Sequence, residues 1–156
     1  MSESQQAAAP YRVPPPILYL GMLVVGLVLS AVWPTPLLSG WLPMAIGVLL
    51  VALGLVVGAS AVVTMRRAGE SPNPTEPTRT LVVNGPFQFT RNPLYLALTL
   101  IDAGIALAFS SLWALALLVV VLLIMDRSVI AREEQYLQGQ FGDRYVQYQA
   151  RVRRWL

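Results

Sequence analysis

The feature that most constrains this chain is a series of apolar runs of the length that crosses a lipid bilayer. A membrane-spanning helix needs about 20 mostly apolar residues, and four stretches approach or exceed that length: residues 17–33, 41–65, 93–109 and 112–125. Hydrophobic residues make up 56% of the chain and charged residues only 12%, against roughly 25% charged in soluble domains. The sequence therefore predicts an all-α integral membrane protein with four transmembrane helices.

Helix-breaking and helix-capping residues separate these runs. Pro34 and Pro36 follow the first run, and no small-x-small cleavage site comes after it, which favours an uncleaved helix over a signal peptide. Pro93 suits the first position of the third helix. Ser110 and Ser111 are natural N-cap residues for the fourth.

The fourth run has no stop signal at its apolar end. Helix-forming residues continue through DRSVIAREEQYLQ as far as Gly139 and Gly142, so we expect one long helix whose end extends into the cytosol. In the last segment, DRYVQYQARVRRWL, the side chains of Tyr145, Tyr148 and Trp155 alternate at helical spacing with arginines. This pattern predicts an amphipathic helix at the membrane interface.

Composition divides the chain into four regions. The loop before the third run is rich in proline and glycine and is long for a compact domain, so it is either functional or disordered. The regions are a flexible N-terminal tail (residues 1–16), a transmembrane hairpin (17–65), a cytosolic loop (66–92), and a second transmembrane hairpin with a cytosolic C-terminal part (93–156).

The basic residues set the expected orientation. All eleven are arginines, and with four spans every one of them falls on the side of the tail, the loop and the C-terminal part. By the positive-inside rule that side is cytoplasmic, so both termini of this multi-pass cell-membrane protein are expected there. Trp33, Trp41 and Trp113 fall at the opposite interface, as in an aromatic belt. Anionic lipid head groups, rather than nucleic acid, are the expected counter-charge.

The residue inventory excludes several kinds of chemistry. The chain has no cysteine and no histidine, which excludes disulfides, thiolate nucleophiles and a histidine general base, and we expect no metal site. It has no lysine either, which excludes a lysine Schiff base. Any reaction must depend on carboxylates, arginines, tyrosines, backbone groups or a bound cofactor.

Two charged stretches are expected to meet on the cytoplasmic face. The third and fourth runs form a hairpin with almost no turn, so Arg91 and Asn92 should lie near the charged residues that follow the fourth run. At about 100° per residue, Asp126 and Glu133 share one helix face and Glu134 points elsewhere. One glutamate is then free for a cationic ligand while the other pairs with an arginine. The alternative is a solvated helix exit with a simple Arg–Glu pair.

Asp102 is unusual because it lies about 13 Å into the third run, at 1.5 Å per residue. An ionisable group at that depth is costly and is a functional candidate by default. The alternative is a protonated or hydrogen-bonded packing residue that faces Thr99 or the Ser110 side of the bundle.

Two separated blocks of sequence resemble a known family. The stretch GPFQFTRNPLY, an apolar hairpin, and then REEQYLQGQFGDRYVQYQARVRRW are similar to the isoprenylcysteine carboxyl methyltransferases and their phospholipid N-methyltransferase relatives. The family signature runs G-P-(aromatic)-x-(aromatic)-x-R-H-P-x-Y and then E-E-x-x-L-x-x-x-F-G-x-x-Y-x-x-Y. The similarity covers residues 80–155, and both blocks agree in content, spacing and order.

The resemblance implies a membrane-embedded methyltransferase that uses S-adenosylmethionine on the cytosolic side and acts on a lipophilic acceptor, such as a lipid or isoprenoid carboxylate. Asn92 stands where the family carries a histidine, which favours a role in binding, or an acceptor that is already nucleophilic. Carried over by position, the cofactor walls are Arg91, Asn92, Pro93 and Tyr95 on one side and Glu133 and Glu134 on the other, and the catalytic residues on the acceptor side are Tyr145, Tyr148, Arg151 and Arg154.

The expected chemistry suits this inventory. Methyl transfer from a sulfonium is an in-line displacement whose main demand is positioning. Glu133 or Glu134 can neutralise the ammonium of the cofactor or bind its ribose, and Arg91 or the N–H groups of a helix start can hold its carboxylate.

Two other functions remain as alternatives. The first is an NADPH-dependent reductase of the sterol or enone type, which has a related membrane fold; the short chain argues against it. The second is a non-enzymatic four-helix transporter with Asp102 as its coupling carboxylate, and the paired signature blocks argue against that.

Overall fold

The computed structural model describes residues 14–35, 37, 39–73 and 76–156, and these form helices and connecting segments without a strand. The predicted all-α fold is confirmed. Most of the N-terminal tail, residues 1–13, lies outside the described residues, as does Pro36. The elements are α1 (Pro15–Val32), α2 (Leu42–Arg67), the 3₁₀ turn η2 (Gly85–Gln88), α3 (Pro93–Ala108), α4 (Leu112–Ile124), the π-helical turn η3 (Met125–Ile130), α5 (Ala131–Phe141) and α6 (Asp143–Arg151).

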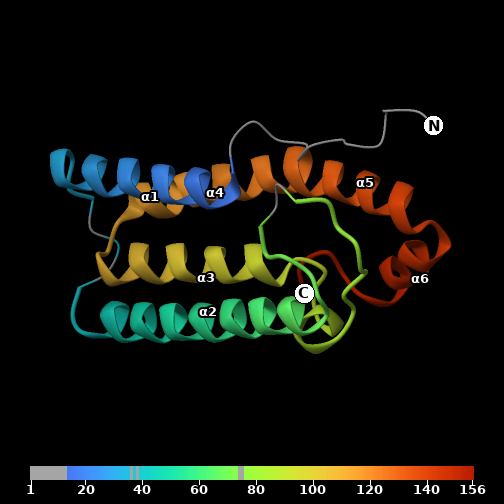
Figure 1. Ribbon diagram of the computed structural model, residues 1–156. Coiled ribbons are helices and arrows are strands. Elements are labelled where there is room, and N and C mark those ends of the chain that lie inside the picture. Colours follow the sequence, from blue (N-terminus) through green and yellow to red (C-terminus); the bar gives the residue numbers. More distant parts are fainter. Residues whose placement is uncertain (1–13, 36, 38, 74–75) are drawn as a thin grey trace.

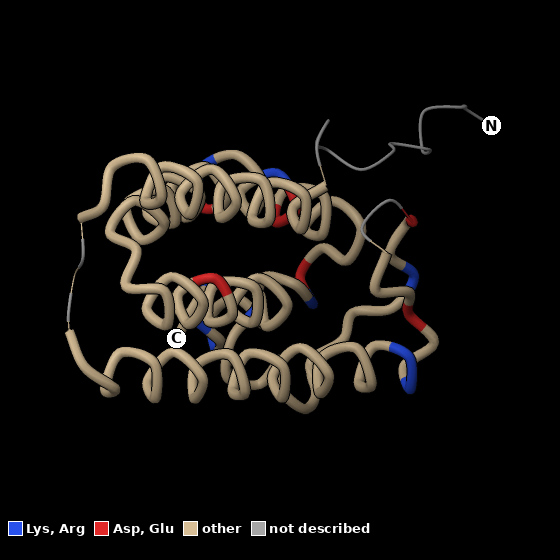
Figure 2. Tube along the Cα trace, turned by 90° about the vertical axis from the view of Figure 1, so that its left-hand side faces the viewer, with Lys and Arg blue, Asp and Glu red and all other residues tan. Residues whose placement is uncertain are grey.

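The helices form two pairs that lie side by side. Helix α1 packs along α4, and α2 packs along α3 (Figure 1). The loop after α2, the turn η2, helices α5 and α6 and the C-terminal residues gather at one end of the bundle (Figure 1). Long stretches of the helical trace carry neither acidic nor basic residues (Figure 2). The end that holds α5 and α6 is called the charged end below.

Small residues allow α2 and α3 to approach at backbone distance. A Cβ added at Gly47 would lie 2.5 Å from the carbonyl oxygen of Gly104, and one added at Gly54 would lie 2.8 Å from that of Ala97. Close approach through small residues is the usual way that transmembrane helices pack, because there is no hydrophobic driving force between them in lipid. The seven-residue spacing of Gly47, Gly54 and Ala61 keeps these residues on one helix face.

A second close contact joins α1 to α4. A Cβ at Gly26 would lie 2.5 Å from the Cα of Ala114. Ser111 accepts a hydrogen bond from the backbone N–H of Ala114 at 3.1 Å, which confirms the predicted N-cap of α4. Its hydroxyl also lies 2.5 Å from that of Ser30 in α1. Trp113 donates its indole N–H to the carbonyl of Trp33 at this same end.

Within the described residues, three helices are long and apolar enough to cross a membrane: Pro15–Val32, Leu42–Arg67 and the continuous helix Leu112–Phe141. The last has 30 residues and joins α4, η3 and α5 without a break, as the absence of a stop signal predicts. Helix α3 is apolar but has only 16 residues, fewer than the roughly 20 of a full span. Of the four expected spans, three are therefore long and apolar enough to cross a membrane, and the count of four is not confirmed.

Replacing Gly47 by leucine should separate α2 from α3. The new side chain meets the backbone of α3, which cannot move aside as a flexible side chain can, so we expect a loss of roughly 1–3 kcal/mol or more in the free energy of unfolding. Thermal unfolding of the detergent-solubilised protein measures this. Gly21→Leu is the matched control, because a Cβ at Gly21 has nothing within 4 Å. Equal melting temperatures for the two variants would contradict this packing.

Candidate functional site

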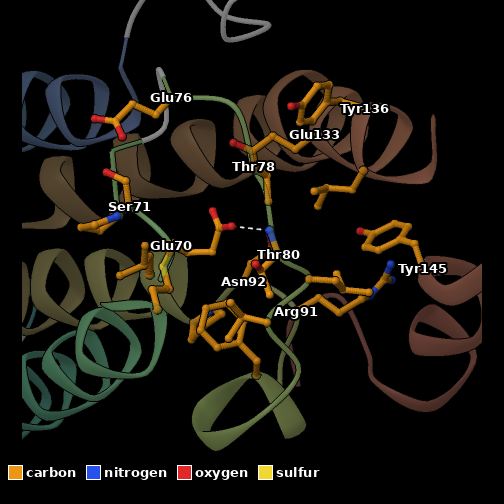
Figure 3. Close-up of a pocket in the computed structure, with 18 of the residues that line it drawn as sticks. Glu70, Ser71, Glu76, Thr78, Thr80, Arg91, Asn92, Glu133, Tyr136 and Tyr145 are labelled. Carbon is orange, nitrogen blue, oxygen red and sulfur yellow. Dashed lines mark hydrogen bonds between the residues drawn. The ribbon is translucent and has the colours of Figure 1, made fainter. Parts of the chain in front are cut away.

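A cavity of about 200 Å³ lies at the charged end of the bundle. Its walls come from the end of α2, the loop after it, the start of α3, and helices α5 and α6. Glu133 and Tyr136 approach from α5, Tyr145 from α6, and Arg91 and Asn92 from the chain before α3 (Figure 3). The lining residues predicted from the sequence are Arg91, Asn92, Pro93, Tyr95, Glu133, Glu134, Tyr145 and Tyr148.

The approach to α3 is shaped by a turn that needs glycine. Gly85 has a φ of +59°, a left-handed conformation that other residues adopt at a cost. A Cβ there would lie 2.7 Å from the hydroxyl oxygen of Thr64 in the last turns of α2. The turn therefore brings η2 against the end of α2, and α3 then begins at Pro93 as expected.

A carboxylate from α5 holds two arginines. Glu134 lies 2.8 Å from Nη1 of Arg91 and 2.5 Å from Nη2 of Arg154. The side chains of Arg91 and Glu134 are each only 13% exposed, so the pair is screened little by solvent. Arg154 also contacts Asp126 at 3.0 Å, and its hydrogen bonds to Glu134 raise the pKa of its guanidinium.

The π-helical turn η3 explains why Asp126 and Glu134 share Arg154. In a regular α-helix seven residues complete almost two turns, so Glu133 would lie in line with Asp126. A π-helical turn has i→i+5 hydrogen bonds and takes up about one more residue, which puts Glu134 in that position. The predicted grouping of Asp126 with Glu133 is therefore wrong. The two glutamates do have different partners, as expected.

Glu133 meets the other signature block. Its carboxylate accepts a hydrogen bond from the hydroxyl of Tyr95 at 2.5 Å, and both side chains line the cavity. Figure 3 shows Glu133 across the cavity from Arg91. A cavity with a carboxylate on one wall and a guanidinium on the opposite wall suits a ligand that carries both a cationic and an anionic group.

Asn92, at the position of the family histidine, is hydrogen-bonded to the C-terminal segment. Its amide donates to the backbone carbonyl of Arg154 at 2.9 Å, and the hydroxyl of Thr90 donates to the same oxygen at 3.1 Å. The backbone N–H of Arg91 donates to the carbonyl of Arg153 at 3.0 Å. The segment after α6 is thereby fixed beside the start of α3.

Tyr145 and Tyr148 place α6 against the cavity. Gly142, with a φ of +54°, turns the chain between α5 and α6. Burial raises the pKa of Tyr145, and the nearby carboxylate of Glu134 raises it further. Burial also raises the pKa of Tyr148, whose hydroxyl donates to the carbonyl of Phe87 at 2.6 Å. Both phenols therefore stay protonated at neutral pH.

The two arginines expected on the acceptor side do not line this cavity. Arg154 lies in the ion-pair cluster with Glu134 and Asp126. Arg151 lines a separate groove on the outer side of α6. The structure thus brings together the two tyrosines of the predicted catalytic set and places its two arginines elsewhere.

Glu70 is a lining residue that the sequence interpretation missed. It is 7% exposed, and its carboxylate accepts hydrogen bonds from the backbone N–H groups of Arg79, at 2.8 Å, and Thr80 (Figure 3). This contact holds residues 76–82 over the cavity. The only signal in the sequence was an acidic residue within a proline-rich loop, and that pattern gives no partner.

Asp102 lies away from the cavity. It is 6% exposed within α3 and is not one of the residues that line the site. The alternative in which Asp102 faces Thr99 is not supported by a hydrogen bond between the two side chains. The hydroxyl of Thr99 contacts that of Tyr19 at 2.9 Å and donates to the carbonyl of Tyr95 at 2.8 Å.

Asn92→Ala should loosen the C-terminal segment, because the carbonyl of Arg154 loses its amide donor. We expect a loss of about 1 kcal/mol in local stability, seen as faster amide hydrogen exchange in residues 152–156. Asn84→Ala is the control, since Asn84 is exposed and its side chain does not cap η2. Unchanged exchange in Asn92→Ala would show that the segment is held by other contacts.

Comparison with known proteins gives the family of the chain. An uncharacterised protein of Haemophilus influenzae is 40% identical to this chain over 63 residues, which are its whole length and 40% of this chain. No solved structure matches the chain. Residues 42–144, from the start of α2 to the first turn of α6, match the family model for phospholipid methyltransferases. The match confirms the resemblance seen in the two signature blocks, and the chain belongs to the phospholipid methyltransferase family.

Proposed function

We propose that this protein is an S-adenosylmethionine-dependent methyltransferase that acts on a lipophilic acceptor at the cytoplasmic face of a membrane. The observation that carries the proposal is the cavity at the charged end, where two blocks far apart in the sequence meet. Arg91 and Tyr95 come from the first block, and Glu133 and Glu134 come from the second. Family membership implies methyl transfer, and the cavity supplies a place for the donor.

The lining residues fit the chemical groups of the methyl donor. Glu133 offers a carboxylate to the cationic amino-acid end. Nε of Arg91 is buried and has no hydrogen-bond partner among the described residues, so it offers a donor to a carboxylate. Phe87 and Leu137 supply apolar walls for the base. An orphaned buried donor is costly, and a ligand carboxylate would satisfy it.

Methyl transfer requires that donor and acceptor are correctly oriented, and it requires neither a metal nor a histidine. When bound, the donor supplies an electrophilic methyl group on its sulfonium. The protein holds the acceptor in line with that group, which is the main source of rate enhancement in such a displacement. Because Tyr145 and Tyr148 stay protonated, an amine acceptor would need one of the carboxylates that line the cavity to take its proton. A carboxylate acceptor needs no such transfer.

The cavity must widen to admit the whole donor. Its volume of about 200 Å³ is below the roughly 300–1,000 Å³ of most small-molecule sites. Residues 76–82 form the wall that is held mainly by the carboxylate of Glu70 through backbone N–H groups. We propose that this wall moves outward when the donor binds, because it is not part of any helix.

The acceptor is proposed to arrive sideways from the bilayer. Four spans with both termini in the cytoplasm would place the cavity at the inner membrane surface, because the arginines gather at this end. Helix α3 is then a short fourth span that begins at the cavity, with Pro93 and Tyr95 in its first turn.

Isotopic labelling tests the reaction. Membranes that contain the protein are incubated with S-adenosylmethionine carrying a labelled methyl group, and lipid extracts are analysed by mass spectrometry. We expect the label in a lipid-soluble product that is absent from membranes without the protein. Label that stays entirely in the water-soluble fraction would contradict a lipophilic acceptor.

Glu133→Gln tests the cofactor wall. Glutamine can still accept a hydrogen bond from Tyr95, so the fold should persist while the negative charge is lost. Hydrogen bonds to charged groups contribute about 1.5–3 kcal/mol, so calorimetry should show donor affinity lowered by roughly tenfold or more. Asp143→Asn, an exposed residue outside the cavity, should leave it unchanged. Wild-type affinity in Glu133→Gln would remove this residue from the site.

A further inference from the structure

A second groove lies on the outer side of α6. It has a volume of about 480 Å³ and separates α6 from the chain around η2. Two arginines, Arg144 and Arg151, line it from α6 together with Gln147 between them. Its remaining lining residues are Leu81, Val83, Gln88, Tyr148 and Val152.

The two arginines of the groove have no acidic partner among the described residues. Neither takes part in the ion pairs of Glu134 and Asp126, which involve Arg91 and Arg154, and no acidic side chain lines the groove. Arg144 and Arg151 are seven positions apart on one helix, so their guanidinium groups extend from the same face. Two neighbouring cations of this kind attract a ligand with a phosphate group, which guanidinium groups hold through several hydrogen bonds.

The apolar part of the groove points to the kind of molecule that carries the phosphate. Leu81, Val83 and Val152 supply apolar contacts beside the arginines. The groove also borders η2, whose Gly85 touches Thr64 near the end of the apolar helix α2. Phe89, just after η2, is 73% exposed. A phosphate ligand with an apolar tail, located where the helices leave the bilayer, is a phospholipid.

We propose that the groove between α6 and η2 binds the head-group phosphate of an anionic phospholipid, with Arg144 and Arg151 as the phosphate ligands. An adjacent face of α6 lines the cavity of the candidate site, and Leu81 and Tyr148 line both spaces. The bound lipid therefore seats α6, and with it the cavity wall, against the membrane surface. The site is distinct from the proposed donor site and does not depend on methyl transfer.

Calorimetric titration with a short-chain lipid tests the site on the full-length protein in detergent, without any methyl donor. Dihexanoyl phosphatidylglycerol, below its micelle concentration, is the probe. A basic residue near an anionic membrane surface contributes roughly a fivefold gain in affinity, so Arg144→Gln with Arg151→Gln should lower affinity about 20-fold. The matched control is Arg66→Gln with Arg67→Gln, which removes the same charge from exposed positions at the end of α2.

Two further arms identify the ligand. Dihexanoyl phosphatidylcholine and inorganic phosphate should each bind at least tenfold more weakly than the anionic lipid, because the cationic choline of the first offsets its phosphate charge and the second has no apolar tail. Arg144→Lys with Arg151→Lys should bind the lipid more tightly than the glutamine variant and more weakly than the wild type, because the charge remains while guanidinium hydrogen bonds are lost. The proposal is overturned if the glutamine variant binds the lipid as well as the control does, or if inorganic phosphate binds as tightly as the lipid. Because no donor is present, failure of the methyltransferase proposal would leave these results unaffected.

Discussion

The charged end of this protein depends on one carboxylate, that of Glu134, which contacts both Arg91 and Arg154. Arg91 belongs to the chain that starts α3, and Arg154 belongs to the segment after α6. Removing one partner of a buried ion pair leaves the other charge uncompensated, so this single side chain couples three parts of the chain. The cavity exists because these parts are held at fixed separation, with Asn92 adding a second tie to the C-terminal segment.

The apolar runs, and the proline and serine residues at their ends, predicted most of the fold. Helix α3 begins at Pro93 and Ser111 caps α4 as expected, because proline and serine act through local geometry. The continuous helix through Ala131 also follows from the lack of a stop signal. The π-helical turn could not be predicted, since the residues Met125–Ile130 carry no local signal for it, and it changes which glutamate lies in line with Asp126.

The residues of the candidate site that lie in the two signature blocks could be predicted from the sequence, and the other residues could not. Arg91, Tyr95 and Glu133 were assigned by the resemblance, and the structure brings them to one cavity. Glu70 was missed because its role depends on backbone N–H groups of a loop, which have no sequence signature. Arg151 lines the second groove and not the cavity, because different faces of α6 line these two spaces.

Asn92 shows how a chain without histidine can keep this architecture. The amide does not act as a proton carrier; it fixes a backbone carbonyl at the edge of the cavity. A site that works by orientation tolerates such a change more easily than one that moves protons. The carboxylates of Glu70 and Glu134 hold the walls of the cavity through their contacts with the loop and with two arginines.

Calorimetric titration of the wild-type protein in detergent with S-adenosylmethionine, and separately with NADPH, identifies which cofactor the cavity binds. We expect saturable binding of S-adenosylmethionine with one site per chain and no binding of NADPH. Binding of NADPH without binding of S-adenosylmethionine would contradict it and assign the cavity to a reductase.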